Sequence, residues 1–250
     1  MMKKHIPLWL SLIFIIGLLV PVEAFASDII PGIDLGNSSD PDSVWNTVTI
    51  VLLITILSVA PAILILMTCF TRIVIVLGFV RTALATQQMP PNQVLLGLAL
   101  FMTLFVMAPT IVEVNEVAVQ PYLQGDISQM EALDQAAKPI KQFMIKQTRE
   151  KDLKLFLDYS GAERPASVDD VPLTALIPAF AISELKTAFQ MGFMIYIPFL
   201  VIDMVVASVL MGMGMMMLPP VMISLPFKIL LFILVDGWHL VVKYLGLRFH

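Results

Sequence analysis

Charge is scarce in this sequence of 250 residues. Only 14% of the residues are charged, whereas about a quarter are charged in an ordinary soluble domain. Apolar residues make up 58% of the chain, and the mean hydropathy is +0.90. A chain of this length cannot enclose so much apolar surface in water. The composition therefore excludes an ordinary soluble domain and favours a protein that is partly covered by lipid.

Cysteine, histidine and blocks of basic residues are also scarce. Cys69 is the only cysteine, which excludes an intrachain disulfide and a cysteine-built metal site, and we interpret it as a small buried apolar residue. His5, His239 and His250 form no cluster typical of a metal site, so no cofactor is expected. The net charge of −4 and the absence of a Lys/Arg block exclude an ordinary nucleic-acid-binding protein.

The motifs of common catalytic sites are missing. No His-Glu-x-x-His, Gly-x-Ser-x-Gly or Gly-x-x-x-x-Gly-Lys pattern occurs. Asp203 and Asp236 are conceivable as an intramembrane aspartyl pair, but neither lies in a Gly-x-Gly-Asp context. We therefore expect that the protein is not an enzyme.

The first 47 residues have the pattern of an exported start. Residues 1–26 combine a basic beginning, an apolar stretch and a final Ala-Phe-Ala, as in a secretory signal peptide. Cleavage is expected between Ala26 and Ser27, and an uncleaved anchor helix is the alternative. Residues 27–47 are then expected to be a flexible periplasmic leader.

Residues 48–112 contain two long uncharged windows, which predict a first helical hairpin. Pro61 is expected to kink or break its first helix. The connector, at about residues 72–93, holds Arg72 and Arg81 and no acidic residue. Because positive charge is retained in cytoplasmic loops, this connector is predicted to be cytoplasmic.

Residues 113–183 are rich in charge and form the predicted periplasmic helical segment. Apolar residues recur at helical spacing within it, at Ile140, Phe143 and Met144 and again from Leu153 to Leu157. One or two amphipathic helices make no core of their own, so we expect this segment to pack on neighbouring subunits.

Residues 184–250 are again apolar, but prolines and charges interrupt them, and we predict a second helical hairpin joined at Pro219 and Pro220. Broken helices that carry charges are tolerated where they face protein or a water-filled path. Glu184 and Lys228 are predicted to form an intersubunit charge pair, with snorkelling of Lys228 to the interface as the alternative. The other ionisable residues expected to find buried partners are Lys186, Asp203 and Asp236.

Residues 211–220 are the most unusual segment because they combine methionines with helix breakers. Methionine side chains fill irregular spaces and rearrange, whereas glycine weakens a helix and paired prolines end it. We predict a gate loop that seals a pore when it is repeated around a ring; ordinary packing of membrane helices is the alternative. The predicted gasket is Met211, Met213, Met215, Met216 and Met217, and the predicted breakers are Gly212, Gly214, Pro219 and Pro220.

Several long segments resemble one known family. Residues 172–190 and 197–211 are similar to its first signature, and residues 225–238 to its second. Upstream, residues 70–77 and 86–93 also fit. On these motifs the chain is identified as a member of the FliP family of flagellar type III secretion.

The resemblance implies an all-α integral membrane protein with broken helical hairpins. Several copies, a pentamer by resemblance, are expected to form a ring with FliQ-like and FliR-like subunits and other membrane proteins of the export apparatus. This export gate passes unfolded flagellar subunits across the bacterial inner membrane, at the centre of the flagellar basal body. The exported leader and the long acidic segment favour this interpretation over a virulence-injectisome homologue. A secondary transporter is a further alternative, which the absence of an internal repeat disfavours.

Overall fold

Every regular element in the described part of the chain is a helix, which confirms the predicted all-α class. Two compact units divide the chain, Met1–Pro61 and Ala62–His250. The predicted signal peptide and its cleavage point, between Ala26 and Ser27, lie outside the described residues. The residues that the computed structural model describes are 41–86, 88–161, 165, 167–168, 170–215 and 217–249.

The described part of the first unit is helix α2, which runs from Pro41 to Leu66 and crosses the boundary between the units. Its apolar side chains from Val51 to Val59 are exposed. Pro61 lies within this helix and does not end it. Of the two expected effects of Pro61, a break is therefore wrong, and a kink stays a prediction. Proline is tolerated in apolar helices because neighbouring hydroxyls and local backbone adjustment satisfy the freed carbonyl.

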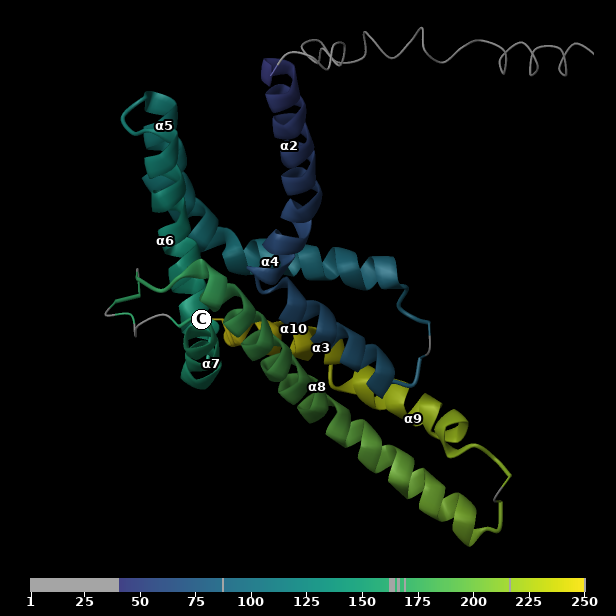
Figure 1. Ribbon diagram of the computed structural model, residues 1–250. Coiled ribbons are helices and arrows are strands. Elements are labelled where there is room, and N and C mark those ends of the chain that lie inside the picture. The colour runs from purple at the N-terminus through teal and green to yellow at the C-terminus, as the bar shows by residue number, and fades with distance from the viewer. Residues whose placement is uncertain are drawn as a thin grey trace, which may run out of the picture. The chain divides into compact units, whose positions relative to one another are not determined.

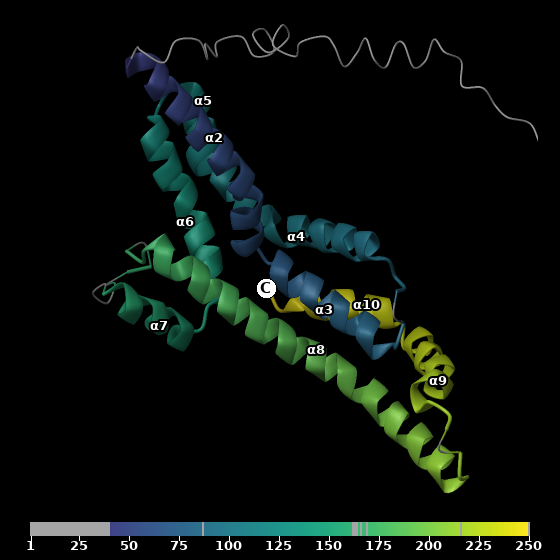
Figure 2. The same ribbon diagram turned by 45° about the vertical axis from the view of Figure 1, so that its right-hand side comes forward.

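The core of the second unit is built around helix α3 (Phe70–Ala83). One face of α3 is fully buried, at Ile73, Val76, Leu77 and Val80, and it packs against α4 and α8. Figures 1 and 2 show α3 lying alongside α8. The predicted cytoplasmic connector therefore contains a core helix, and the predicted two-helix hairpin contains three helices, α2, α3 and α4.

Helix α8 (Leu173–Gly212) runs unbroken for 40 residues. It passes through Pro178 and Pro198, so the prediction that Pro198 interrupts this region is wrong. The predicted boundary between the periplasmic segment and the second hairpin, at 183 and 184, also falls inside this helix. At 1.5 Å per residue, α8 is about 60 Å long, roughly twice the hydrocarbon thickness of a bilayer.

Two stretches in the described part of the chain have the length and apolar character to cross a membrane, Asn92–Gln124 and Leu173–Gly212. The first is made of α4 (Asn92–Val114), a π-helical turn η2 (Asn115–Val119) and α5 (Gln120–Gln124). A third candidate is the pair α9 (Pro220–Leu234) and α10 (Gly237–Leu247), which is bent by 63°.

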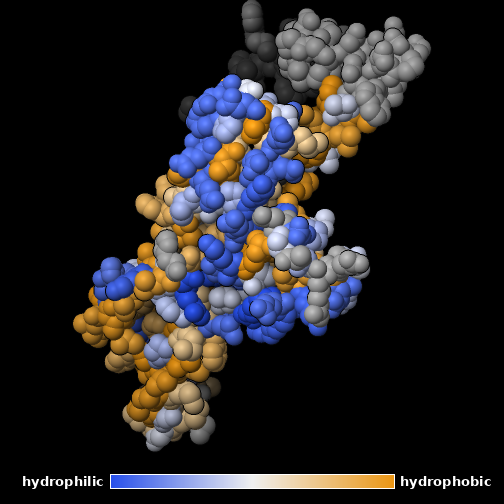
Figure 3. Space-filling view, turned by 90° about the vertical axis from the view of Figure 1, so that its left-hand side faces the viewer, coloured by the Kyte–Doolittle hydropathy of each residue, from blue (hydrophilic) through white to orange (hydrophobic). Residues whose placement is uncertain are grey.

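The charged region between α5 and α8 forms two amphipathic helices, α6 (Gln129–Gln147) and α7 (Glu150–Ser160). The start of α6 is a capping box, in which Ser128 and Glu131 satisfy each other's backbone amides. These hydrogen bonds hold the pKa of the Glu131 carboxyl below its ordinary value. Figure 3 shows a mostly hydrophilic face over α5, α6 and α7, while hydrophobic residues gather toward the far end of α8.

The apolar faces of α6 and α7 pack on the beginning of α8 in the same chain. The buried residues of this apolar cluster are Met144, Val171, Leu176 and Phe180. The predicted apolar residues Ile140, Phe143 and Leu153 pack against them. The premise that this segment finds no core within its own chain is therefore wrong, and its packing on neighbouring subunits stays a prediction. The reason is that α8 extends far enough toward α6 and α7 to supply the missing apolar surface.

Glycine allows close approach of α3 to α8. A Cβ added at Gly192 would lie 2.4 Å from two ring atoms of Phe79 and 2.9 Å from its Cβ, whereas Gly78 on α3 has open space around it. We predict that Gly192→Ala lowers the free energy of unfolding by about 1–3 kcal/mol, because the base of the Phe79 ring cannot move without shifting α3. The matched control Gly78→Ala should raise it by up to about 1 kcal/mol. Thermal unfolding of the purified variants in detergent measures both, and equal stability of the two variants would contradict the close packing.

Candidate functional site

The first feature of the site is a buried ion pair between Arg72 on α3 and Glu184 on α8. Arg72 is 2% exposed and Glu184 is 0% exposed. The Arg72 Nε donates to Glu184 Oε2 at 2.9 Å, and Nη2 donates to Oε1. Both carboxylate oxygens are thus engaged by one guanidinium, the bidentate arrangement that favours arginine over lysine.

Two further groups complete this site. The Nη2 of Arg72 also donates to Oε1 of Gln147, at the end of α6, at 3.0 Å. The guanidinium carbon lies 4.1 Å from the ring centroid of Phe249, near the C-terminus. This stacking adds a cation–π contact. One arginine therefore connects α3, α6, α8 and the C-terminal residues.

A second ion pair joins α8 to α9. The Nζ of Lys228 donates to Oδ2 of Asp203 at 2.6 Å, and the hydroxyl of Ser224 donates to Oδ1 at 2.5 Å. Lys228 is 1% exposed and Ser224 is fully buried. Asp203 therefore has a partner for each oxygen, and Lys228 does not snorkel to the surface.

The predicted pair between Glu184 and Lys228 is corrected by these contacts. Each residue is buried against a different partner of its own chain, Arg72 and Asp203 respectively. The physical reason is that a buried charge needs a close and fully hydrogen-bonded counter-ion. The prediction that Glu184, Lys228 and Asp203 require partners is confirmed, whereas the partners assigned to Glu184 and Lys228 were wrong.

The methionine segment forms the connection between α8 and α9. Helix α8 ends at Gly212, Gly214 has a left-handed φ of +76°, and α9 begins at Pro220 with Pro219 as its N-cap. The segment is exposed: the solvent-exposed fractions are 65% for Met211, 60% for Met213, 47% for Met215 and 99% for Met217. Met216 lies outside the described residues. The four described methionines are therefore not held in the core of this chain.

The remaining predicted residues have three different surroundings. Lys186 is exposed on α8 and lies beside Lys151 of α7. Asp236 is exposed and adopts a left-handed φ of 51° at the bend between α9 and α10. The predicted burial of Lys186 and of Asp236 is therefore wrong. Cys69 is fully buried, as interpreted from the sequence, and burial raises the pKa of its thiol to about 12.

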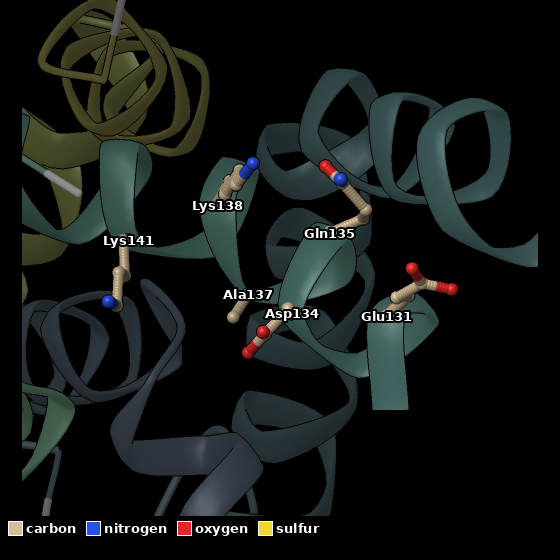
Figure 4. Close-up of a pocket in the computed structure, with 6 residues that line it drawn as sticks. All are labelled: Glu131, Asp134, Gln135, Ala137, Lys138 and Lys141. Carbon is tan, nitrogen blue, oxygen red and sulfur yellow. The ribbon is translucent and has the colours of Figure 1, made fainter. Parts of the chain in front are cut away.

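A polar hollow of about 310 Å³ lies along α6. It is lined by side chains from successive turns of the helix, and in Figure 4 these side chains do not converge on one point. Within the described residues, no group of three His, Cys, Asp or Glu side chains is placed to hold a metal ion. The hollow therefore shows no arrangement suited to a cofactor.

Sequence reasoning missed Arg72, Gln147 and Ser224 as members of the site. The sequence analysis places Arg72 in the predicted cytoplasmic connector and assigns it no partner, although it lies between apolar residues at helical spacing, which is typical of a core position. Gln147 and Ser224 are neutral polar residues that carry no such signal.

Paired charges inside and apolar side chains outside define a helical membrane protein. The profile of the FliP family matches residues 53–245, and the chain belongs to this family.

Relatives from distant bacteria are similar along most of their length. The chain is 68% identical over 211 residues to the flagellar biosynthetic protein FliP of Bacillus subtilis, covering 84% of this chain and 96% of that protein. It is 50% identical to the protein of the same name from Pectobacterium carotovorum, covering 88% of this chain and 86% of that protein. It is 45% identical to the flagellar biosynthetic protein FliP of Aquifex aeolicus, covering 90% of this chain and 94% of that protein.

The ion pair of Arg72 and Glu184 generates a testable prediction. Arg72→Met and Glu184→Gln are each expected to lower the free energy of unfolding by about 3–5 kcal/mol, because each leaves the other group buried without its counter-ion. The double variant should lose much less than the sum of the two single losses.

Arg81→Met is the matched control, since Arg81 is on the same helix and donates to Asn92 at the surface. It is expected to cost about 0–1 kcal/mol. Denaturation of the four purified variants in detergent gives the coupling energy. Additive losses in the double variant would contradict the pair.

Proposed function

We propose that this chain is a subunit of the flagellar type III protein-export gate, and that copies of it form a ring through which unfolded flagellar subunits cross the inner membrane. Membership of the FliP family carries this proposal. The relatives named above are all called flagellar biosynthetic proteins, which favours the flagellar gate over the injectisome alternative.

The exposed apolar surface of the second unit supports a role within an assembly. Large side chains such as Phe101, Phe105 and Phe193 are 68%, 81% and 59% exposed in a single copy. Two open apolar grooves of about 510 and 590 Å³ border α9. Patches of this kind mark surfaces that lipid or other proteins cover. We propose that neighbouring copies, arranged as a pentamer, and FliQ-like and FliR-like subunits cover part of them.

The proposed placement follows the same assembly. The gate lies in the inner membrane at the flagellar basal body, with residues 113–183 on the periplasmic side and other membrane proteins of the export apparatus around it. No catalytic role is proposed for the chain. Exported flagellar subunits are its cargo, and the ring provides their path.

We propose that the connection between α8 and α9 is the gasket of this path. The exposed fraction of Met217, at 99%, shows that the connection is free of the chain's own core. Flexible thioethers from several copies fill the centre of a ring without a fixed shape, and their contacts of about 0.1–0.2 kcal/mol per atom pair accumulate only when the plug is closed.

Restoration of export in a Bacillus subtilis strain that lacks its own FliP tests the proposed function. This chain is expected to restore swimming and the release of filament protein into the medium, because the two proteins are 68% identical. An empty vector is the negative control, and secretion of an unrelated extracellular protein shows that general export is intact. Stable expression of the chain in the membrane without any restored filament export would contradict the proposal.

Replacement of Met215, Met216 and Met217 by alanine tests the gasket. The triple variant should assemble normally but let small ions cross the membrane, because shorter side chains leave the centre of the ring open. Conductance and complex yield are measured on the same preparation. A well-assembled, ion-tight triple variant would refute the gasket, and a low complex yield would instead assign these methionines to ordinary packing.

A further inference from the structure

The exposed face of α8 changes character along its length. Its outward positions recur every three or four residues, and near the middle of the helix they are Lys186, Phe189 and Gln190. From Phe193 to Val205 every outward position is apolar. The exposed members of this stripe are Phe193, Met194, Ile197, Leu200, Val201, Met204 and Val205.

The apolar part of α8 has the length of one hydrocarbon layer. Residues 193–212 rise by about 30 Å at 1.5 Å per residue, which equals the thickness of the hydrocarbon core. Ser208 is the exposed polar residue of this range, and its hydroxyl donates to the carbonyl of Met204 within the helix. Asp203 lies in this part, but it is turned toward α9, where Ser224 and Lys228 engage it. Gln190 and Lys186 therefore lie where the apolar stripe meets the polar half of the helix.

A basic cluster lies at this boundary, and we define it as Arg149, Lys151 and Lys186. The side chains of Lys151 and Lys186 are close enough to interact, and the charge of Arg149 also acts on Lys186. The Nη2 of Arg149 donates to Thr187 and Gln190 of α8, each at 3.2 Å. These contacts hold the start of α7 beside α8, so the cluster is built from two helices.

Two acidic residues of the first turn of α7, Glu150 and Asp152, lie beside the three cationic residues of the cluster, so a net positive charge of one remains among these five residues. One carboxylate, that of Asp152, acts on Lys186, and it also accepts a hydrogen bond from the buried Ser183 at 2.6 Å. Arg149 and Lys151 disfavour the positive charge of Lys186, whereas Asp152 favours it. Two ammonium groups side by side repel each other unless an anion lies between them.

We propose that the basic cluster binds the phosphate of an anionic phospholipid whose acyl chains lie along the side of the stripe formed by Phe193, Ile197, Leu200 and Met204, which lines neither of the grooves beside α9. A ligand that carries negative charge at one end and hydrocarbon at the other matches both parts of this surface. Basic residues that flank membrane helices attract anionic lipid in this way. A free phosphate would match the cluster but not the stripe. The inference requires membrane insertion and is independent of the proposed export function.

The test is a lipid titration of the purified full-length protein in detergent, followed by native mass spectrometry. Phosphatidylglycerol is expected to bind more tightly than phosphatidylcholine. Lys151→Gln and Lys186→Gln should each weaken the binding of phosphatidylglycerol about fivefold and leave that of phosphatidylcholine unchanged. A Lys138→Gln/Lys146→Gln variant removes two charges from α6 instead, and its binding should equal that of the unchanged protein.

Three results would overturn the proposal. The first is unchanged binding of phosphatidylglycerol by a Lys151→Gln/Lys186→Gln variant that unfolds at the same temperature as the control. The second is displacement of the lipid by millimolar inorganic phosphate, which would identify the ligand as a free anion. The third is a loss of oligomers with intact lipid binding, which would assign the cluster to contact with a second copy. Because motility is not measured, failure here is distinct from failure of the export function.

Discussion

The guanidinium of Arg72 is the constraint on which the second unit depends. A buried arginine cannot lose its charge, so the structure has to surround it with partners. Glu184, Gln147 and the ring of Phe249 do so from three separate parts of the chain. Because each partner has a defined direction, the orientations of α3, α6 and α8 and the position of the C-terminal residues become linked. Apolar packing alone tolerates many arrangements of similar area, whereas this contact tolerates few.

Helix α8 carries the acidic residues of both buried ion pairs, Glu184 and Asp203. Their cationic partners come from α3 and α9. The two carboxylates are separated by about 28 Å along the helix axis at 1.5 Å per residue. Each end of the long helix is thus attached to a different element by a charge-assisted contact. Between the two carboxylates, Gly192 of α8 packs closely against the ring of Phe79 on α3.

Sequence patterns predicted the helical class, the connection at Pro219 and Pro220 and the need for charge partners, because these depend on local composition. They did not predict the partners themselves. Arg72 and Glu184 are 112 residues apart, and no local pattern reports such a contact. Prolines were overestimated as breaks, because Pro198 removes only one backbone hydrogen bond and lies inside an unbroken helix of 40 residues. The bend at Asp236 was not predicted: Asp236 has a left-handed φ of 51°, and a Cβ at the neighbouring Gly237 would lie 2.2 Å from the ring of Phe232.

The buried charges of the second unit are paired within the chain, whereas its exposed surface needs partners from outside. Inside, Arg72 and Lys228 are each satisfied by the chain's own carboxylates, so folding of the unit requires no external counter-ion. Outside, α8 presents the basic cluster and then an apolar face that the described residues leave exposed. An exterior of this kind is stable only against lipid or against other apolar protein surfaces. The charged interior of the second unit is therefore complete in a single copy, whereas its apolar face and the methionine connection remain exposed.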